Sequence, residues 1–269
     1  MPLEIILSIS VVGTVGLCFG IILSITAKKF KVETDPRVDK ILEVLPNANC
    51  GACGAPGCEG FAKGVVEGKY PCHGCIPGGQ DVAEKVSKIL GVQAETSVKQ
   101  IAVLMCGGTR QLSPDIANYD GVNTCRSAHL ILGGSKACVY GCISFGDCVE
   151  ACPFDAIHIG KQGLPQIDGQ KCTGCGNCVQ ACPKNILKLY PVDTPLILAC
   201  SNPEKLKEVK AVCKVGCIAC SLCVKKAPPQ ALKMENNLPR LQPDAPKDIK
   251  LYEEAVNSCP SKCLKLGVD

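Results

Sequence analysis

The sequence predicts an α+β protein in which a single N-terminal transmembrane helix precedes several small cysteine-rich modules. Two observations predict this architecture: an uncharged apolar run opens the chain, and 23 cysteines are distributed along its 269 residues. The chain has no Trp and few aromatic residues, so we expect metal sites to replace much of a large apolar core. A formal net charge of +4 gives no sign of nucleic-acid binding.

The stretch from Cys138 to Cys182 holds eight cysteines in 45 residues, and two cysteine runs within it end in Cys-Pro. The run that starts at Cys172 has the spacing of a two-cluster ferredoxin, in which the fourth cysteine ligates the other cluster. The earlier run has wider gaps, which we expect to enlarge the loop without changing the number of ligands. Zinc also binds paired cysteines, but two interlocked runs that end in proline favour iron-sulfur clusters. The predicted [4Fe-4S] ligand sets are Cys138, Cys142, Cys148 and Cys182 for one cluster, and Cys152, Cys172, Cys175 and Cys178 for the other.

Residues 5–27 carry no charge, and at a rise of about 1.5 Å per residue they can cross a hydrocarbon layer of about 30 Å as a helix. A cleaved signal peptide would have a basic start and a shorter apolar run, whereas this run follows Glu4. The basic residues after it are Lys28, Lys29 and Lys31. The positive-inside rule therefore predicts a single-pass protein with its N-terminus outside and its iron-sulfur modules on the cytoplasmic side of the cell membrane, where cysteines stay reduced.

Two glycines of this helix, Gly16 and Gly20, are four residues apart and lie on one face. Such a pair of small residues lets a second membrane helix approach closely. Glycine is also generally enriched in membrane helices, so ordinary composition explains the pair equally well.

A small helical [4Fe-4S] domain is predicted next, between two amphipathic helices. The first helix starts at Asp35-Pro36 and ends before Pro46, and the second ends at Gly91. The cysteines between them are Cys50, Cys53, Cys58, Cys72 and Cys75. Cys50, Cys53 and Cys58 lie in a glycine-rich loop that suits close wrapping around a cluster, and Cys72 and Cys75 are rivals for the fourth ligand.

A short apolar pattern recurs after each cysteine run and predicts the strand that follows a ferredoxin loop. Its four copies begin at Cys152, Cys182, Ala227 and Cys259. This register identifies a second ferredoxin-like module that holds only one cluster, with the ligands Cys217, Cys220, Cys223 and Cys259. The ligands of its other cluster are replaced together, by Ala227, Ile249, Tyr252 and Ala255. Cys263 is expected to be a small core residue.

The four predicted [4Fe-4S] clusters leave seven cysteines without a ligand role, namely Cys18, Cys72, Cys106, Cys125, Cys200, Cys213 and Cys263. Two of them, Cys106 and Cys200, end predicted strands at residues 101–105 and 196–199, and a Cys-x3-Cys pair follows each strand. This parallel indicates a longer repeat. A further cluster made of Cys106, Cys125, Cys200 and Cys213 is the alternative, but strand-end thiols in a reducing compartment are more often unligated.

The order of these motifs resembles the B subunit of the Rnf ion-translocating electron-transport complex, in an extended form. The resemblance rests on the membrane span with its basic stop, the run from Leu45 to Cys58, the Cys75-x-Pro77-Gly78-Gly79 motif and the double-cluster module. It favours Cys75 over Cys72 as the fourth ligand of the first cluster. It also implies soluble ferredoxin as a partner, a flavin-containing subunit that handles NAD, and coupling to Na+ or H+ movement.

The predicted domains are a transmembrane anchor (1–31), a four-cysteine domain (32–92), a connecting region with a strand (93–135), a two-cluster module (136–192) and a degenerate one-cluster module (193–269). No nucleotide-binding fold or catalytic triad is visible, so we expect no bond-making chemistry in this chain alone. We therefore predict a membrane-anchored electron-transfer subunit of an ion-translocating ferredoxin:NAD oxidoreductase, a translocase. The alternatives are an anchored iron-sulfur subunit that reduces or acts as a redox sensor, and a structural zinc protein.

Overall fold

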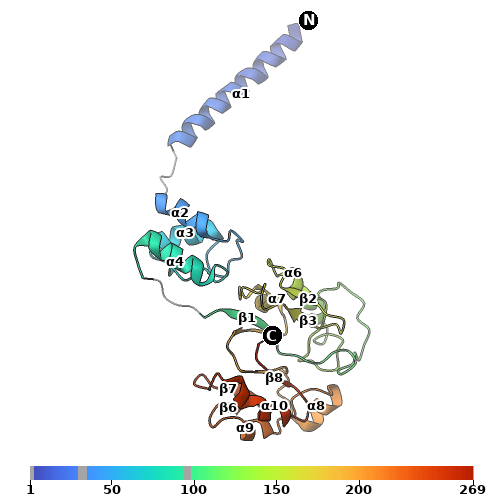
Figure 1. The fold of residues 1–269 in the computed structure, drawn as a ribbon. Coiled ribbons are helices and arrows are strands. Elements are labelled where there is room, and N and C mark those ends of the chain that lie inside the picture. The colour runs from blue at the N-terminus through green and yellow to red at the C-terminus, as the bar shows by residue number, and fades with distance from the viewer. Residues whose placement is uncertain (1–2, 30–34, 94–97, 269) are drawn as a thin grey trace.

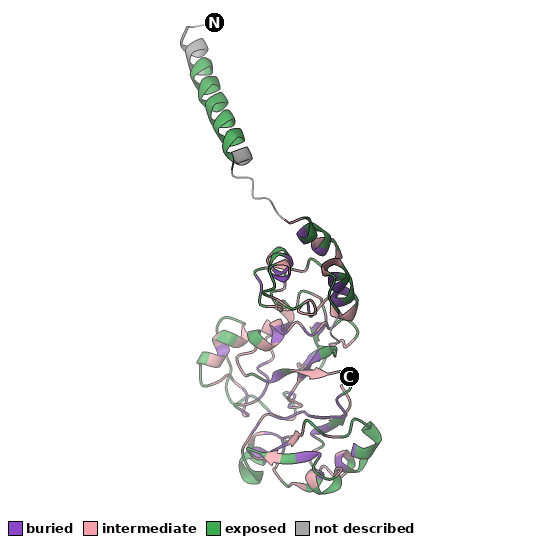
Figure 2. Ribbon diagram, turned by 90° about the vertical axis from the view of Figure 1, so that its left-hand side faces the viewer, coloured by how far each residue is buried: buried purple, intermediate pink, exposed green. Residues whose placement is uncertain are grey.

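The computed structural model describes residues 3–29, 35–93 and 98–268. Helix α1 (Leu3–Lys29) contains a stretch, Ile9–Thr26, that is long and apolar enough to cross a membrane. Figure 2 shows this helix exposed along its described length, and nothing lies within 4 Å of a Cβ placed on Gly16 or Gly20. The predicted apolar helix is confirmed, whereas Lys31 and the predicted boundary between 31 and 32 lie outside the described residues.

Three helices form the N-terminal module: α2 (Pro36–Val44), α3 (Cys58–Val66) and α4 (Gly79–Leu90). The Asp35 side chain accepts a hydrogen bond from the Arg37 backbone N–H at 2.9 Å and caps α2, while Gly91, with φ of 71°, ends α4. Both predicted helices are confirmed. The core between them includes Ile41 and Phe61. Helix α3 was not predicted, because it begins at a cysteine of the expected loop.

The next module contains β1 (Gln100–Leu104), α5 (Cys125–Leu130), α6 (Asp147–Glu150), β2 (Ile157–Ile159), β3 (Pro165–Ile167), α7 (Asn177–Ala181) and β4 (Leu187–Pro191). Strands β1 and β4 pair antiparallel, with Gln100 opposite Pro191 and Leu104 opposite Leu187. Strands β2 and β3 form a separate antiparallel pair. The first and last strands of the module thus lie side by side and bracket its cysteine loops.

The C-terminal module contains β5 (Leu196–Leu198), α8 (Leu206–Val212), α9 (Leu222–Lys226), β6 (Leu232–Glu235), β7 (Leu238–Leu241), the 3-10 helix η1 (Ile249–Tyr252), α10 (Glu253–Asn257) and β8 (Leu264–Leu266). Strand β5 pairs antiparallel with β8, and β6 pairs with β7. The module therefore repeats the order of the preceding one, in which the first and last strands pair around a central strand pair. The four apolar copies after the cysteine runs form β2, β4, β6 and β8, as predicted.

Backbone hydrogen bonds join these two modules just after β1 and β5. The Gly107 N–H of the first module donates to Ala199 O of the C-terminal module at 3.0 Å. Within the C-terminal module, the Ala199 N–H donates to Cys263 O at 2.7 Å and so extends the pairing of β5 with β8. A single apolar cluster includes Met105 from one side and Leu198 from the other. The modules follow one another in Figure 1, with the N-terminal helices beyond the first of them. The predicted strand-end cysteines Cys106 and Cys200 consequently meet at this junction.

Candidate metal centres

Site 1 is a cavity of the N-terminal module lined by the four predicted ligands Cys50, Cys53, Cys58 and Cys75. Cys72 does not line it. The Asn49 side chain accepts a hydrogen bond from the Cys58 N–H at 2.8 Å and so ties the loop to the start of α3. Gly57 adopts φ of 90° there, and a Cβ on it would lie 2.8 Å from Asn49 Oδ1. The loop can therefore pass close to the cavity only with glycine at this position.

Site 3 is formed by the predicted set Cys152, Cys172, Cys175 and Cys178. Burial, and after it the charges of the other three cysteines, raise the pKa of Cys178 to about 12, which shows that the four side chains lie near one another. The Ala102 N–H of β1 donates to Cys172 Sγ at 3.4 Å. The loop approaches β1 so closely that a Cβ on Gly174 would lie 2.4 Å from Gln100 O.

Site 2 is a cavity lined by three cysteines of the remaining predicted set, Cys142, Cys148 and Cys182. The structure does not bring the fourth, Cys138, to this cavity, and Cys125 lines it instead. The carboxylate of Asp147 accepts hydrogen bonds from the Cys125 N–H at 2.6 Å and the Arg126 N–H at 3.0 Å. This contact holds α5 against the start of α6. Sequence spacing gave no signal for Cys125, because 22 residues separate it from Asp147.

Site 4, in the C-terminal module, is a cavity lined by the predicted set Cys217, Cys220, Cys223 and Cys259. Cys263 is buried, as expected of a core residue, but it also lines the cavity, and its Sγ lies 3.6 Å from Cys259 Sγ. Its hydrogen bond lowers the pKa of Cys259 to about 5. Of the residues that replace the second ligand set, Tyr252 and Ala255 are completely buried and Ala227 packs against the same apolar core. The fourth, Ile249, is 43% exposed.

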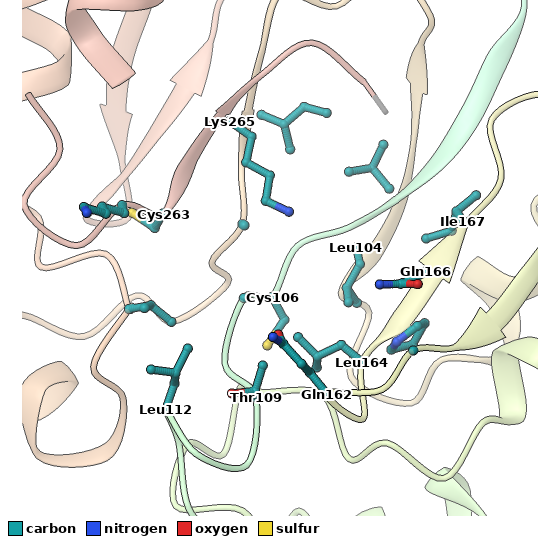
Figure 3. A pocket seen from close by; sticks show the side chains of 18 of the residues that line it. Leu104, Cys106, Thr109, Leu112, Gln162, Leu164, Gln166, Ile167, Cys263 and Lys265 are labelled. Carbon is teal, nitrogen blue, oxygen red and sulfur yellow. The ribbon is translucent and has the colours of Figure 1, made fainter. Parts of the chain in front are cut away.

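Cys138 lines a further cavity at the junction of the two modules, together with Cys106, Cys200 and Cys213. A larger cavity of about 430 Å³ lies on another side of Cys106, between β1, β3, β5 and β8. Figure 3 shows that its walls carry apolar and amide side chains, with Cys106 and Cys263 on different segments of the chain. Of these two cavities, only the one that Cys138 lines brings four thiols together.

The surroundings of these thiols fit a cluster better than free cysteines. Burial, aided by nearby thiolates, raises the pKa of Cys148 to about 12, and burial raises that of Cys142 to about 11. Such thiols ionise only next to positive charge, which bound metal provides. Within the described residues, no group of three or more His, Cys, Asp or Glu side chains is arranged to hold a single metal ion.

Electrostatic effects between cysteines of different sets indicate the order of the sites. After burial, the charge of Cys50 in site 1 raises the pKa of Cys175 in site 3. The charge of Cys178 in site 3 likewise raises the pKa of Cys148 in site 2. Sites 1, 3 and 2 therefore follow one another, with a neighbour at each step. When bound, [4Fe-4S] clusters supply one-electron redox chemistry, and the protein tunes their potential through hydrogen bonds, charge and burial.

The fold and its cysteine sets define an iron-sulfur protein of the electron-transfer class. Two family models match the chain: one described as "Putative Fe-S cluster" matches residues 45–77, and one described as a 4Fe-4S dicluster domain matches residues 136–186. The first range contains all four cysteines of site 1, and the second contains all four of site 3 and Cys142, Cys148 and Cys182 of site 2.

Three curated relatives, all B subunits, extend the match over most of the chain. The relative from the Na(+)-translocating ferredoxin:NAD(+) oxidoreductase complex of Acetobacterium woodii is 43% identical over 98% of this chain and 79% of the relative. The relative from the ion-translocating oxidoreductase complex of Methanosarcina acetivorans is 35% identical over 96% of this chain and 97% of the relative. The relative from the proton-translocating ferredoxin:NAD(+) oxidoreductase complex of Clostridium ljungdahlii is 42% identical over 87% of this chain and 83% of the relative.

The chain belongs to the family of B subunits of the Rnf ion-translocating oxidoreductase complexes. It is an iron-sulfur electron-transfer subunit of such a complex. The predicted resemblance and fold class are confirmed.

Proposed function

We propose that this subunit carries electrons between soluble ferredoxin and the other subunits of a membrane-bound, ion-translocating complex linked to NAD. The observation that carries the proposal is the unbroken order of sites 1, 3 and 2, in which cysteines of successive sets influence one another. Such an order suits stepwise one-electron transfer. The names of the Acetobacterium and Clostridium relatives, which contain ferredoxin:NAD(+) oxidoreductase, support the two ends of the path.

The proposed ligands are those of the predicted sets, except that the cavity at site 2 supports a different cysteine at one position. Site 1 uses Cys75 in preference to Cys72, because only Cys75 lines the cavity. Sites 3 and 4 use their four predicted cysteines. In site 2, the cavity supports Cys125 as the partner of Cys142, Cys148 and Cys182, in place of the predicted Cys138. At least four [4Fe-4S] clusters result.

The residues of this chain bind and position the clusters, exclude water and donate hydrogen bonds to sulfur. The Ala102 N–H at Cys172 Sγ is one such donor and favours the more negative, reduced state of site 3. The described residues include no second helix that could span a membrane, so ion movement belongs to partner subunits. A flavin-containing subunit that handles NAD is proposed among those partners.

Helix α1 is proposed to anchor the subunit with its N-terminus outside and the iron-sulfur modules on the cytoplasmic side. The sequence Lys28-Lys29-Phe30-Lys31 at its C-terminal end supports this direction. The open face at Gly16 and Gly20 could accept a helix of a partner subunit, since a Cβ on either residue meets nothing within 4 Å.

The experiment is to mix the anaerobically purified full-length chain with a reduced [2Fe-2S] ferredoxin and follow both proteins by low-temperature EPR after rapid freezing. We expect signals of reduced [4Fe-4S] clusters to replace the ferredoxin signal. NADH alone, as the control donor, should leave the chain oxidised. Reduction by NADH at the same rate as by ferredoxin, or no reduction by ferredoxin, would contradict the proposed role.

A further inference from the structure

Four thiols from four separate segments line the cavity at the junction of the two ferredoxin-like modules. Cys106 follows β1, Cys200 follows β5, Cys213 caps the end of α8 and Cys138 lies in the loop before α6. We propose that these four cysteines, here called the junction site, ligate an additional [4Fe-4S] cluster that lies between site 2 and site 4. The inference rests on the proposed electron-transfer function and adds a step to its path.

The paired strand ends bring the thiols together. The hydrogen bond from the Gly107 N–H to Ala199 O holds the residues before Cys200 next to those after Cys106. A Cβ on the adjacent Gly108 would lie 3.4 Å from Cys213 Sγ and 3.8 Å from Cys106 Sγ. Both sulfurs therefore face the same small space beside a residue that has no side chain.

Donors already point at three of the four sulfurs. The Cys142 N–H donates to Cys106 Sγ at 3.5 Å, and the Cys217 N–H donates to Cys200 Sγ at 3.2 Å. The buried Asn202 side chain donates through Nδ2 to Cys138 Sγ at 3.7 Å. Hydrogen bonds of this kind stabilise the thiolates of iron-sulfur clusters and set their potential. Unligated strand-end thiols would not need such a set of donors.

A buried cation completes the junction site. Lys136 is only 5% exposed, lines the same cavity and donates through Nζ to Gly108 O at 2.7 Å. The described residues place no carboxylate within ion-pair distance of it. A buried ammonium group is costly unless negative charge lies nearby. Four thiolates around an iron-sulfide core carry a net negative charge and would supply it.

The assignment also explains why Cys138 and Cys125 are both in unexpected places. With Cys138 in the junction site, site 2 is completed by Cys125, so that each of the five ligand sets has four cysteines. Only Cys18, Cys72 and Cys263 then remain outside the five sets.

The junction site lies on the path between the modules. One of its sulfurs, on Cys106, receives the N–H of Cys142, which belongs to site 2. Another, on Cys200, receives the N–H of Cys217, which belongs to site 4. The order of centres becomes 1, 3, 2, junction and 4, and the junction site joins the C-terminal module to the rest.

The test is to measure iron and acid-labile sulfide per chain in the anaerobically purified full-length protein. The proposal predicts about twenty irons in the unaltered chain, where four clusters would give about sixteen. Cys200→Ala and Cys213→Ala should each lower the count by about four, and Cys72→Ala, the matched control, should not change it. The double variant Cys138→Ala/Cys142→Ala should lose about eight irons, because its two positions ligate different clusters.

About sixteen irons in the unaltered chain, unchanged in Cys200→Ala, would overturn the junction site and leave the proposed function standing. A loss of only about four irons in the double variant would return Cys138 to site 2. Absence of sulfide would refute the electron-transfer proposal itself. The count in the unaltered chain decides the matter even where a variant fails to fold.

Discussion

The two ferredoxin-like modules share one order of strands and helices, but positions that carry cysteines in the first module carry other residues in the C-terminal module. In the first module, one such place is site 3, with Cys152 and three cysteines of the following run. In the C-terminal module, the repeat register puts Ala227, Ile249, Tyr252 and Ala255 at these positions. Tyr252 and Ala255 are completely buried in an apolar cluster. A predicted metal centre in one module thus corresponds to buried side chains in the other.

The comparison indicates that a cluster and an apolar core are alternative ways to stabilise a module of this size. Small modules bury too little apolar surface to be stable without metal, disulfides or large side chains. In the C-terminal module, the ring of Tyr252 occupies this space, and its hydroxyl donates to Pro246 O at 2.8 Å. The first module has no such residue at the aligned position and depends on its cysteines.

The largest effect should follow from removal of all iron with a chelator. We expect the first module to lose its structure, so that amides of α6 and α7 exchange at rates near those of an unfolded chain. Amides of β6, β7 and α10 should exchange at least ~10-fold more slowly, because the Tyr252 core remains. Hydrogen exchange measured by mass spectrometry checks this. Equal exchange in both modules would mean that the side-chain core does not replace the cluster.

Cys152→Ala should remove about four irons, because it deletes a ligand of site 3. The repeat register aligns Cys152 with Ala227, so the reverse change, Ala227→Cys, is the matched control. That control should add no iron, since Ile249, Tyr252 and Ala255 cannot act as the other ligands. Iron analysis of the two variants decides the point, and extra iron in Ala227→Cys would show that the second cluster was never replaced.

Tyr252→Ala should lower the free energy of unfolding of the C-terminal module by about 3–5 kcal/mol, because it leaves a cavity in place of a completely buried ring. Urea unfolding followed by circular dichroism measures the change. Iron content before unfolding should stay at the level of the unaltered chain, because Tyr252 lines none of the cysteine cavities. A stability within error of the unaltered chain would contradict the role given to this ring.

Tyr252→Phe should have a smaller effect, about 1 kcal/mol, because it removes only the hydrogen bond to Pro246 O. The same urea titration applies. A loss as large as that of Tyr252→Ala would show that the hydroxyl, and not the volume of the ring, stabilises the module.

Local patterns predicted much of this fold. The helical spacing of apolar residues and the Asp35 and Gly91 end signals located α2 and α4, and the repeat after each cysteine run located β2, β4, β6 and β8. Three of the four predicted cysteine sets, those of sites 1, 3 and 4, come together in the structure. Each of these sets has three cysteines within a short stretch, and the repeat register or the family resemblance supplied the more distant fourth ligand of sites 1 and 4.

The position of Cys138 could not be predicted in this way. It lies four residues before Cys142, yet the two thiols line different cavities. Their separation depends on how the long segment between β1 and α6 packs against the residues after β5, which is a tertiary contact between two modules. Cys125 is held at site 2 by a hydrogen bond from its backbone N–H to the carboxylate of Asp147, which lies 22 residues later in the sequence. Sequence spacing contains neither contact.

Analysis of iron, zinc and acid-labile sulfide in the anaerobically purified full-length protein shows whether this chain holds a line of [4Fe-4S] clusters. We expect sulfide equal to iron, at least about sixteen of each per chain, with negligible zinc. Low-temperature EPR after dithionite reduction should then show interacting reduced clusters. A colourless protein that contains zinc and no sulfide would contradict the account and assign the cysteines a structural role.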